Sequence, residues 1–227
     1  MLFGGPGFAL ILVAMLFASF AQIKIRSAYQ KYSMMRVLSG RTGADVAKDI
    51  LRRGGLDGVE VEPIQGVLSD HYDPRARKVR LSSEVFNGSS VAALGIAAHE
   101  TGHALQHHEQ YFPLALRSSI LPVASFGSNL AFPLFFAGLF FNNPLFMDVG
   151  IFLFAGAVLF QIVTLPVEFN ASQRAVALLH TGGYVTREEE GPVRDMLRAA
   201  GYTYLAATAV SLAHFLRLVL LRGSRRR

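Results

Sequence analysis

Apolar residues along this chain are concentrated in four long runs, and polar residues fill the stretches between them. Residues 2–23 carry no charge, and a helix of that length, at ~1.5 Å per residue, spans the ~30 Å hydrocarbon core of a bilayer. Residues 118–141 and 149–167 are also uncharged, and only a short turn containing Asn142-Asn143-Pro144 separates them. We therefore expect this pair to form an antiparallel hairpin that crosses the membrane and returns.

Three of the runs have features that qualify this interpretation. The first is too long and uniform for a cleaved signal peptide, which is the alternative, so we interpret it as a retained anchor. Pro122 and Pro133 are expected to bend the second run. The fourth run, residues 202–221, contains His214 and Arg217 on one helical face. It is either a span whose arginine reaches the interface, which we favour, or a helix packed at the surface.

The polar stretches, residues 24–117 and 168–200, are predicted to form the soluble part of the protein. Thr42 precedes a helix-period pattern that Gly54-Gly55 ends, which predicts a capped amphipathic helix. Ser89 or Ser90 is expected to cap a second helix, the last one before residue 117.

Between these two helices the hydrophobic period changes from helical to alternating. Residues 59–62 and 78–81 alternate apolar and polar side chains, and Asp73-Pro74 is a turn signal between them. This pattern predicts a small antiparallel meander.

Composition supports a membrane protein and narrows the chemistry. Hydrophobic residues make up 52% of the 227 residues and charged residues 17%, whereas a soluble domain carries about a quarter charged residues. The absence of cysteine excludes a disulfide scaffold, a cysteine-ligated zinc finger and a thiol nucleophile, so any metal must bind His, Asp or Glu. The net charge of +6 comes without a basic helix interleaved with aromatic residues, so we expect no nucleic-acid partner.

The second soluble helix carries the H-E-x-x-H pattern at residues 99–103. On a helix, His99 and His103 share one face, so both imidazoles can bind a single Zn²⁺ while Glu100 lies near its open coordination position. The metal lowers the pKa of a bound water to about 7, and Glu100 can accept the proton as the water attacks a carbonyl. Because so short a pattern also arises by chance, two merely solvated histidines are the alternative.

The residues after this motif exclude one class of zinc peptidase. A metzincin requires Gly at position 106 and His at position 109, but this chain has Gln106 and Glu109. His107 lies two turns, or ~12 Å, beyond His99 on a straight helix, so the two cannot share an ion. We expect His107 to be solvated or to interact outside the ligand set.

Two remote acidic residues are candidates for the third ligand. Asp148 lies in the turn between the second and third runs, in a context faintly similar to the third-ligand segment of intramembrane site-2 proteases, but at the opposite membrane face from His99. Glu168 follows the third run, an even number of crossings from His99, so the chain returns it to the same side. A carboxylate that begins a helix at Pro166-Val167-Glu168 suits zinc, although an acid favoured by the helix dipole is the alternative. Topology favours Glu168.

The segment Asp70-His71-Tyr72-Asp73-Pro74 has two interpretations. A zinc hydrolase needs a donor for the oxyanion of the transition state, and His71 or Tyr72 can supply it if the meander borders the cleft. Otherwise the segment is a hairpin turn without a catalytic part. Strand 78–81, if it is the edge strand beside the metal, would offer backbone groups to an extended substrate.

Three longer segments carry a family resemblance. Gly66–Pro74, Ala97–Gln106 and Thr164–Ser172 resemble, in this order, segments of the YugP-type membrane zinc metallopeptidases of bacteria, and the resemblance covers essentially the whole chain. It implies a gluzincin-like zinc peptidase, distantly similar to HtpX and the CAAX prenyl endopeptidases.

The resemblance also implies the site and the fold. The implied ligands of one zinc ion per chain are His99, His103 and Glu168, with Glu100 as catalytic base. The implied fold is mainly α, a multi-pass membrane protein of about four hydrophobic helices with a small α+β zincin-like cytoplasmic portion. Residues 1–227 would form a single membrane-embedded metallopeptidase domain.

The chain departs from the family pattern at two positions. We expect Asp where this chain has Asn170, and gluzincins often have Asp where it has Ser172. Zinc ligation does not require either residue, but a carboxylate that supports a ligand histidine would have to come from elsewhere. Asp70 and Asp73 are the candidates.

The sequence thus predicts a zinc endopeptidase of the bacterial cell membrane that acts on membrane-associated or unfolded proteins. The alternatives are an intramembrane, site-2-like protease and a non-catalytic scaffold or chaperone with a vestigial metal site. The predicted partners are the lipid bilayer and a peptide or membrane-protein substrate. Lys24, Arg26, Lys31 and Arg36 place the soluble part in the cytoplasm by the positive-inside rule, although a spanning fourth run would put Arg222 outside.

Overall fold

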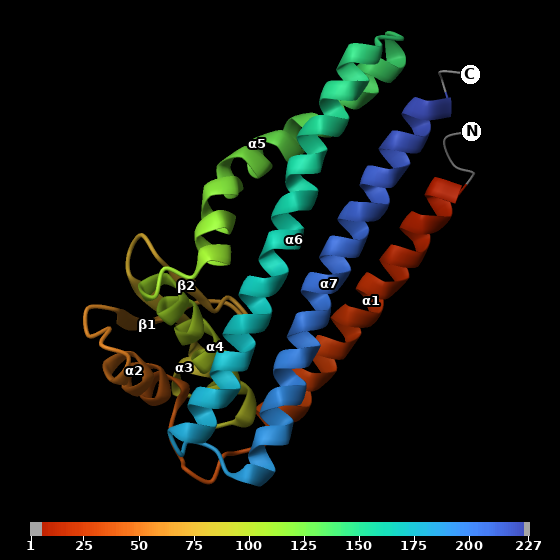
Figure 1. Ribbon diagram of the computed structural model, residues 1–227. Coiled ribbons are helices and arrows are strands. Elements are labelled where there is room, and N and C mark those ends of the chain that lie inside the picture. Colours follow the sequence, from red (N-terminus) through yellow and green to blue (C-terminus); the bar gives the residue numbers. More distant parts are fainter. Residues whose placement is uncertain (1–5, 225–227) are drawn as a thin grey trace. The chain divides into compact units, whose positions relative to one another are not determined.

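A computed structural model of the chain describes residues 6–224, which form seven helices and three strands (Figure 1). Contacts divide the chain into two compact units. The first comprises Met1–Gln22, Ala115–Pro166 and Thr203–Arg227, and the second comprises Ile23–Leu114 and Val167–Tyr202. The predicted class, mainly α with a small sheet, is confirmed.

The first unit consists of parts of four long helices, and each of these helices also has residues in the second unit. They are α1 (Pro6–Ser33), α5 (Phe112–Phe140), α6 (Pro144–Thr181) and α7 (Arg187–Ser224). Within the described residues, these four are long and apolar enough to cross a membrane. Each extends beyond its apolar run, because a helix does not stop where its surroundings change from lipid to water.

The expected hairpin of apolar runs is present as α5 and α6. Pro144 begins α6, and α5 bends along its length, as its two internal prolines predicted (Figure 1). A Cβ on Gly138 would lie 2.6 Å from the backbone nitrogen of Met147, so glycine lets the two helices approach closely beside the turn.

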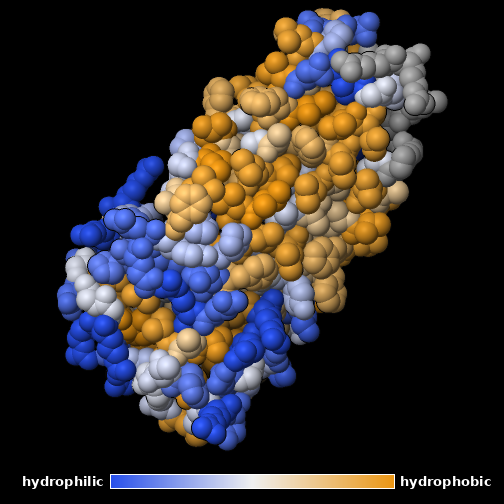
Figure 2. All heavy atoms as spheres, viewed as in Figure 1, coloured by the Kyte–Doolittle hydropathy of each residue, from blue (hydrophilic) through white to orange (hydrophobic). Residues whose placement is uncertain are grey.

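The surface of this helical unit is apolar where a bilayer would contact it. Val13, Phe126 and Phe152 are each at least 66% exposed. Hydrophobic residues cover most of the visible surface of these helices in Figure 2. A contiguous apolar surface of this kind is typical of a protein solvated by lipid.

The second unit contains the short elements and a single main core. Its elements are α2 (Gly43–Arg53), β1 (Glu60–Ile64), β2 (His71–Asp73), β3 (Lys78–Ser82), α3 (Ser83–Asn87) and α4 (Val91–His108). Thr42 caps α2 in a capping box with Asp45, and Ser90 caps α4, so both predicted helix starts are confirmed.

The predicted antiparallel meander is wrong in its pairing. The strand order is β1-β3-β2, with β3 parallel to β1 and antiparallel to β2. Val79 and Leu81 of β3 are fully buried, as expected for the strand at the centre of the sheet. The edge strands are therefore β1 and β2, so the condition under which residues 78–81 would offer an edge to a substrate is not met.

The environment of Glu168 differs from the prediction as well. Pro166 lies inside α6 and does not begin a new helix. Glu168 is therefore a mid-helix residue, which excludes the interpretation of a helix-start acid stabilised by the dipole.

Candidate metal centre

Helix α4 presents its motif from a tightly packed position in the core of the second unit. Ala92, Ala97 and Ala98 are fully buried, so part of the helix before the motif packs through small side chains. A Cβ on Gly102 would lie 3.1 Å from the carbonyl oxygen of Ala171 in α6. Small residues thus let α6 approach the face of α4 that carries the histidines.

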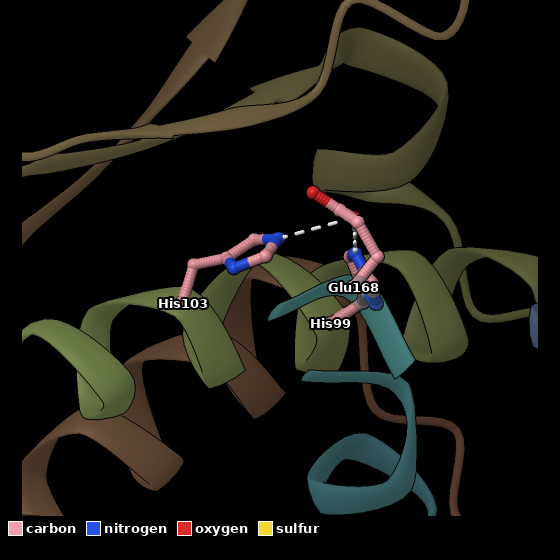
Figure 3. Close-up of side chains that lie close together, drawn as sticks. All are labelled: His99, His103 and Glu168. Carbon is pink, nitrogen blue, oxygen red and sulfur yellow. Dashed lines mark ion pairs between the residues drawn. The ribbon is translucent and has the colours of Figure 1, made fainter. Parts of the chain in front are cut away.

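Three potential metal ligands converge at this helix contact. His99 and His103 of α4 and Glu168 of α6 point toward one another in Figure 3. The Nε2 atoms of His99 and His103 lie 3.3 and 3.6 Å from Oε2 of Glu168. One ligand atom from each residue lies within 4.8 Å of the other two, and this is the single such group in residues 6–224.

All three side chains are shielded from solvent. Those of His99, His103 and Glu168 are 10%, 12% and 3% exposed. A buried carboxylate facing two imidazoles is costly unless a cation or a proton balances its charge.

The hydrogen bonds of Gln106 fix the tautomer of His103. The Gln106 amide nitrogen donates to the carbonyl oxygen of Val167 and to Oδ1 of Asn170, each at 2.9 Å. Its oxygen therefore faces Nδ1 of His103, 2.9 Å away, and can only accept. In its neutral form His103 therefore carries its proton on Nδ1, which leaves the Nε2 lone pair facing Glu168.

His99 has a comparable partner on α6. Its Nδ1 lies 3.1 Å from the hydroxyl of Ser172, which leaves Nε2 directed toward Glu168. Such contacts orient the ring of a metal-binding histidine and raise its basicity.

The prediction that Asp70 or Asp73 supports a ligand histidine is wrong. Asp70 accepts hydrogen bonds from the backbone and hydroxyl of Ser82, and Asp73 pairs with Arg80 at 2.8 Å. Sequence reasoning missed Gln106, although its position three residues after His103 places both side chains on one helical face.

A chain of contacts continues from Gln106 along α6 to the surface. Asn170 accepts a second hydrogen bond from Arg174 at 2.8 Å, and Arg174 pairs with Glu109 at the end of α4 at 2.7 Å. Together these contacts tie the C-terminal end of α4, after His103, to α6.

Glu100 lies beside the three convergent side chains but outside their group. Its Oε2 accepts a hydrogen bond from the backbone N–H of Tyr72 in edge strand β2, at 3.1 Å. Burial raises the pKa of the Glu100 carboxyl above its ordinary value. The motif acid is thus held between the metal-binding face and an edge strand.

The other candidate residues have separate partners. The Tyr72 hydroxyl lies 2.9 Å from Nδ1 of His107, and the His71 ring contacts the carbonyl oxygen of Ser69 at 2.8 Å. His107 lies outside the ligand group, as the helix geometry predicted. Asp148 is also outside it and pairs with Arg222 at 2.8 Å.

The donor set fits a catalytic zinc. Two neutral imidazoles and one carboxylate are a known set of three protein ligands for Zn²⁺ that leaves a fourth position for water or substrate. The group contains no sulfur ligand, and Glu168 supplies the third protein ligand in place of another histidine.

Comparison with known proteins agrees with this chemistry. The chain matches the family described as "Putative neutral zinc metallopeptidase" over residues 7–223. It is 47% identical over 215 residues to a Bacillus subtilis (strain 168) protein named "Putative membrane protease YugP". The aligned region covers 94% of this chain and 96% of that protein. None of the solved structures matches the chain. The family resemblance inferred from the three sequence segments is confirmed.

Proposed function

Because the chain belongs to the family of neutral zinc metallopeptidases that it matches over residues 7–223, we propose that it is a membrane-bound, zinc-dependent endopeptidase. The observation that carries the proposal is the convergence of His99, His103 and Glu168 beside the acid of the same motif. Helix packing brings the third residue from more than sixty positions along the chain to that place.

In the proposed mechanism each of these residues has one role. His99, His103 and Glu168 would hold one zinc ion per chain, which supplies Lewis-acid polarisation and acidifies water when bound. Glu100 accepts the proton of the attacking water and then delivers it to the leaving amine. The raised pKa of its carboxyl brings this group closer to the pH at which it must exchange protons.

The edge strand β2 is the proposed docking place for an extended substrate. Its outer backbone edge faces the motif, since the Tyr72 N–H already donates to Glu100. A peptide pairing with this edge would lie along α4. We propose Tyr72, whose hydroxyl is held by His107, and His71 as candidate donors to the oxyanion of the transition state.

The proposed substrates are membrane-associated or unfolded proteins at the cytoplasmic face. Four cations after the first apolar run, Lys24, Arg26, Lys31 and Arg36, favour this orientation. The helix that carries Glu100 is not among the four described helices that could span a membrane, which favours proteolysis at the surface over intramembrane proteolysis. A vestigial metal site in a scaffold or chaperone is the remaining alternative.

Removing the metal tests this function. Chelation is expected to abolish hydrolysis of an unfolded protein substrate tethered to liposomes that contain the full chain, because no other group replaces the Lewis acid. Adding Zn²⁺ should restore hydrolysis, whereas Mg²⁺, which prefers oxygen ligands, should not. Hydrolysis that continues after elemental analysis shows complete metal removal would rule out a zinc peptidase.

The proposed orientation is tested by labelling introduced cysteines, since the chain has none of its own. In sealed cells, Asn143→Cys is expected to react with a membrane-impermeant maleimide, because the α5–α6 turn lies one crossing from the cytoplasm. Gln110→Cys should react only after the cells are opened. If the two positions label from the same side, the hairpin is not transmembrane.

A further inference from the structure

A second concave site lies away from the proposed active site, between the end of α1 and the start of α7. Both helix segments belong to the second unit, and together they enclose a groove of about 370 Å³. This volume is within the range of small-ligand pockets. The groove shares no residue with the three convergent ligands.

Helical spacing explains why the groove is hollow and why its rim is charged. Lys24 and Lys31 are seven residues apart, so they lie two turns apart on one face of α1. The small residues Ala28 of α1 and Ala199 of α7 line the groove and leave space between the helices. Arg198 adds a third cation from α7.

The groove carries an excess of positive charge. Lys24, Lys31 and Arg198 are exposed and, in the described part of the chain, form no ion pair with a carboxylate. The one acid that lines the groove, Asp195, accepts a hydrogen bond from the buried Tyr32 hydroxyl at 3.3 Å. Three cations and one acid leave a net charge of about +2 for an anion to neutralise.

The position of the groove along both helices indicates the depth at which its ligand would lie. Lys24 is the first charged residue after the uncharged run that ends at Ile23, and Tyr202 is the first residue of the fourth apolar run. Both residues line the groove, so the apolar-to-charged boundaries of α1 and α7 meet there. Tyrosine and basic residues at such boundaries are typical of the headgroup layer.

We propose that this groove binds the phosphate of an anionic phospholipid headgroup. Basic pockets between membrane helices recognise such headgroups, and in the sequence the first uncharged run ends at Ile23, one residue before Lys24 of the groove. Lys24, Lys31 and Arg198 supply charge-assisted hydrogen bonds to the phosphate oxygens. The proposal goes beyond peptide hydrolysis and does not depend on it.

The test measures binding of phosphatidylglycerol to the detergent-solubilised full chain by native mass spectrometry. The wild type is expected to bind phosphatidylglycerol at least ~10-fold more tightly than phosphatidylcholine. Lys24→Gln/Arg198→Gln should lose that preference. Arg26→Gln/Arg36→Gln removes two exposed cations of the same region that do not line the groove, and should keep it within about twofold.

Three outcomes would overturn the proposal. One is equal binding of the two lipids by the wild type, and another is equal loss of preference in both double variants, which would indicate only a diffuse surface field. The third is saturation by inorganic phosphate or glycerol phosphate at the concentration at which the lipid binds, which would assign the groove to a soluble anion. Circular dichroism of each variant shows whether it is folded. Lys24→Arg keeps the charge at position 24 and should keep the preference for phosphatidylglycerol, which separates loss of charge from loss of fold.

Discussion

Glu100→Gln is expected to lower the rate of peptide hydrolysis by roughly two to four orders of magnitude while the protein retains its zinc. Glutamine has the shape of glutamate, and its amide oxygen can still accept the hydrogen bond from the Tyr72 N–H. It cannot accept a proton from water. The substitution therefore removes the base and leaves the ligands in place.

The measurement compares kcat and zinc content of the purified variant with those of the wild type. Glu188→Gln is the control, since Glu188 is an exposed acid on α7 that contacts none of the site residues, and its kcat should not change. Zinc retained together with undiminished hydrolysis in Glu100→Gln would reject the proposed mechanism.

Glu168→Ala is expected to abolish stoichiometric zinc binding and, with it, hydrolysis. Glu168 supplies the one carboxylate of the ligand group and is 3% exposed, so no neighbouring acid or solvent-exposed residue can take its position. With only the two imidazoles of His99 and His103, Zn²⁺ would have two protein ligands in place of three and no carboxylate to balance its charge. Zinc content after dialysis against a weak chelator measures the effect.

Asp148→Asn is the matched control for this loss, because Asp148 was the other remote acid that the sequence offered. Its carboxylate pairs with Arg222 and lies outside the ligand group. The variant should keep about one zinc per chain. Release of zinc by Asp148→Asn, with zinc kept by Glu168→Ala, would reassign the third ligand and make an intramembrane protease the leading interpretation.

Local patterns in the sequence predicted local structure well. Thr42 and Ser90 mark the starts of α2 and α4, because a capping hydroxyl acts within three residues of itself. His99 and His103 could be paired for the same reason, since four residues make about one helical turn. Glu168 could be proposed only from topology, because an even number of predicted membrane crossings separates it from the motif and places both on the same side of the membrane.

Several other features that depend on contacts between distant segments were not predicted. Alternation identified the strands but not their partners, so the parallel pairing of β1 with β3 was missed. The sequence around Pro166 predicts a helix start, yet Pro166 lies inside α6. Ser172 lies beside His99 only because Gly102 lets α6 approach α4, and sequence spacing does not show such an approach.

The zinc content of the wild type and of the double variant His99→Ala/His103→Ala tests the central claim most directly. Elemental analysis of the purified proteins is predicted to find about one zinc per chain in the wild type and essentially none in the double variant, because the latter retains a single ligand. A stoichiometric zinc signal that persists in the double variant would contradict the assignment of the metal centre to these residues.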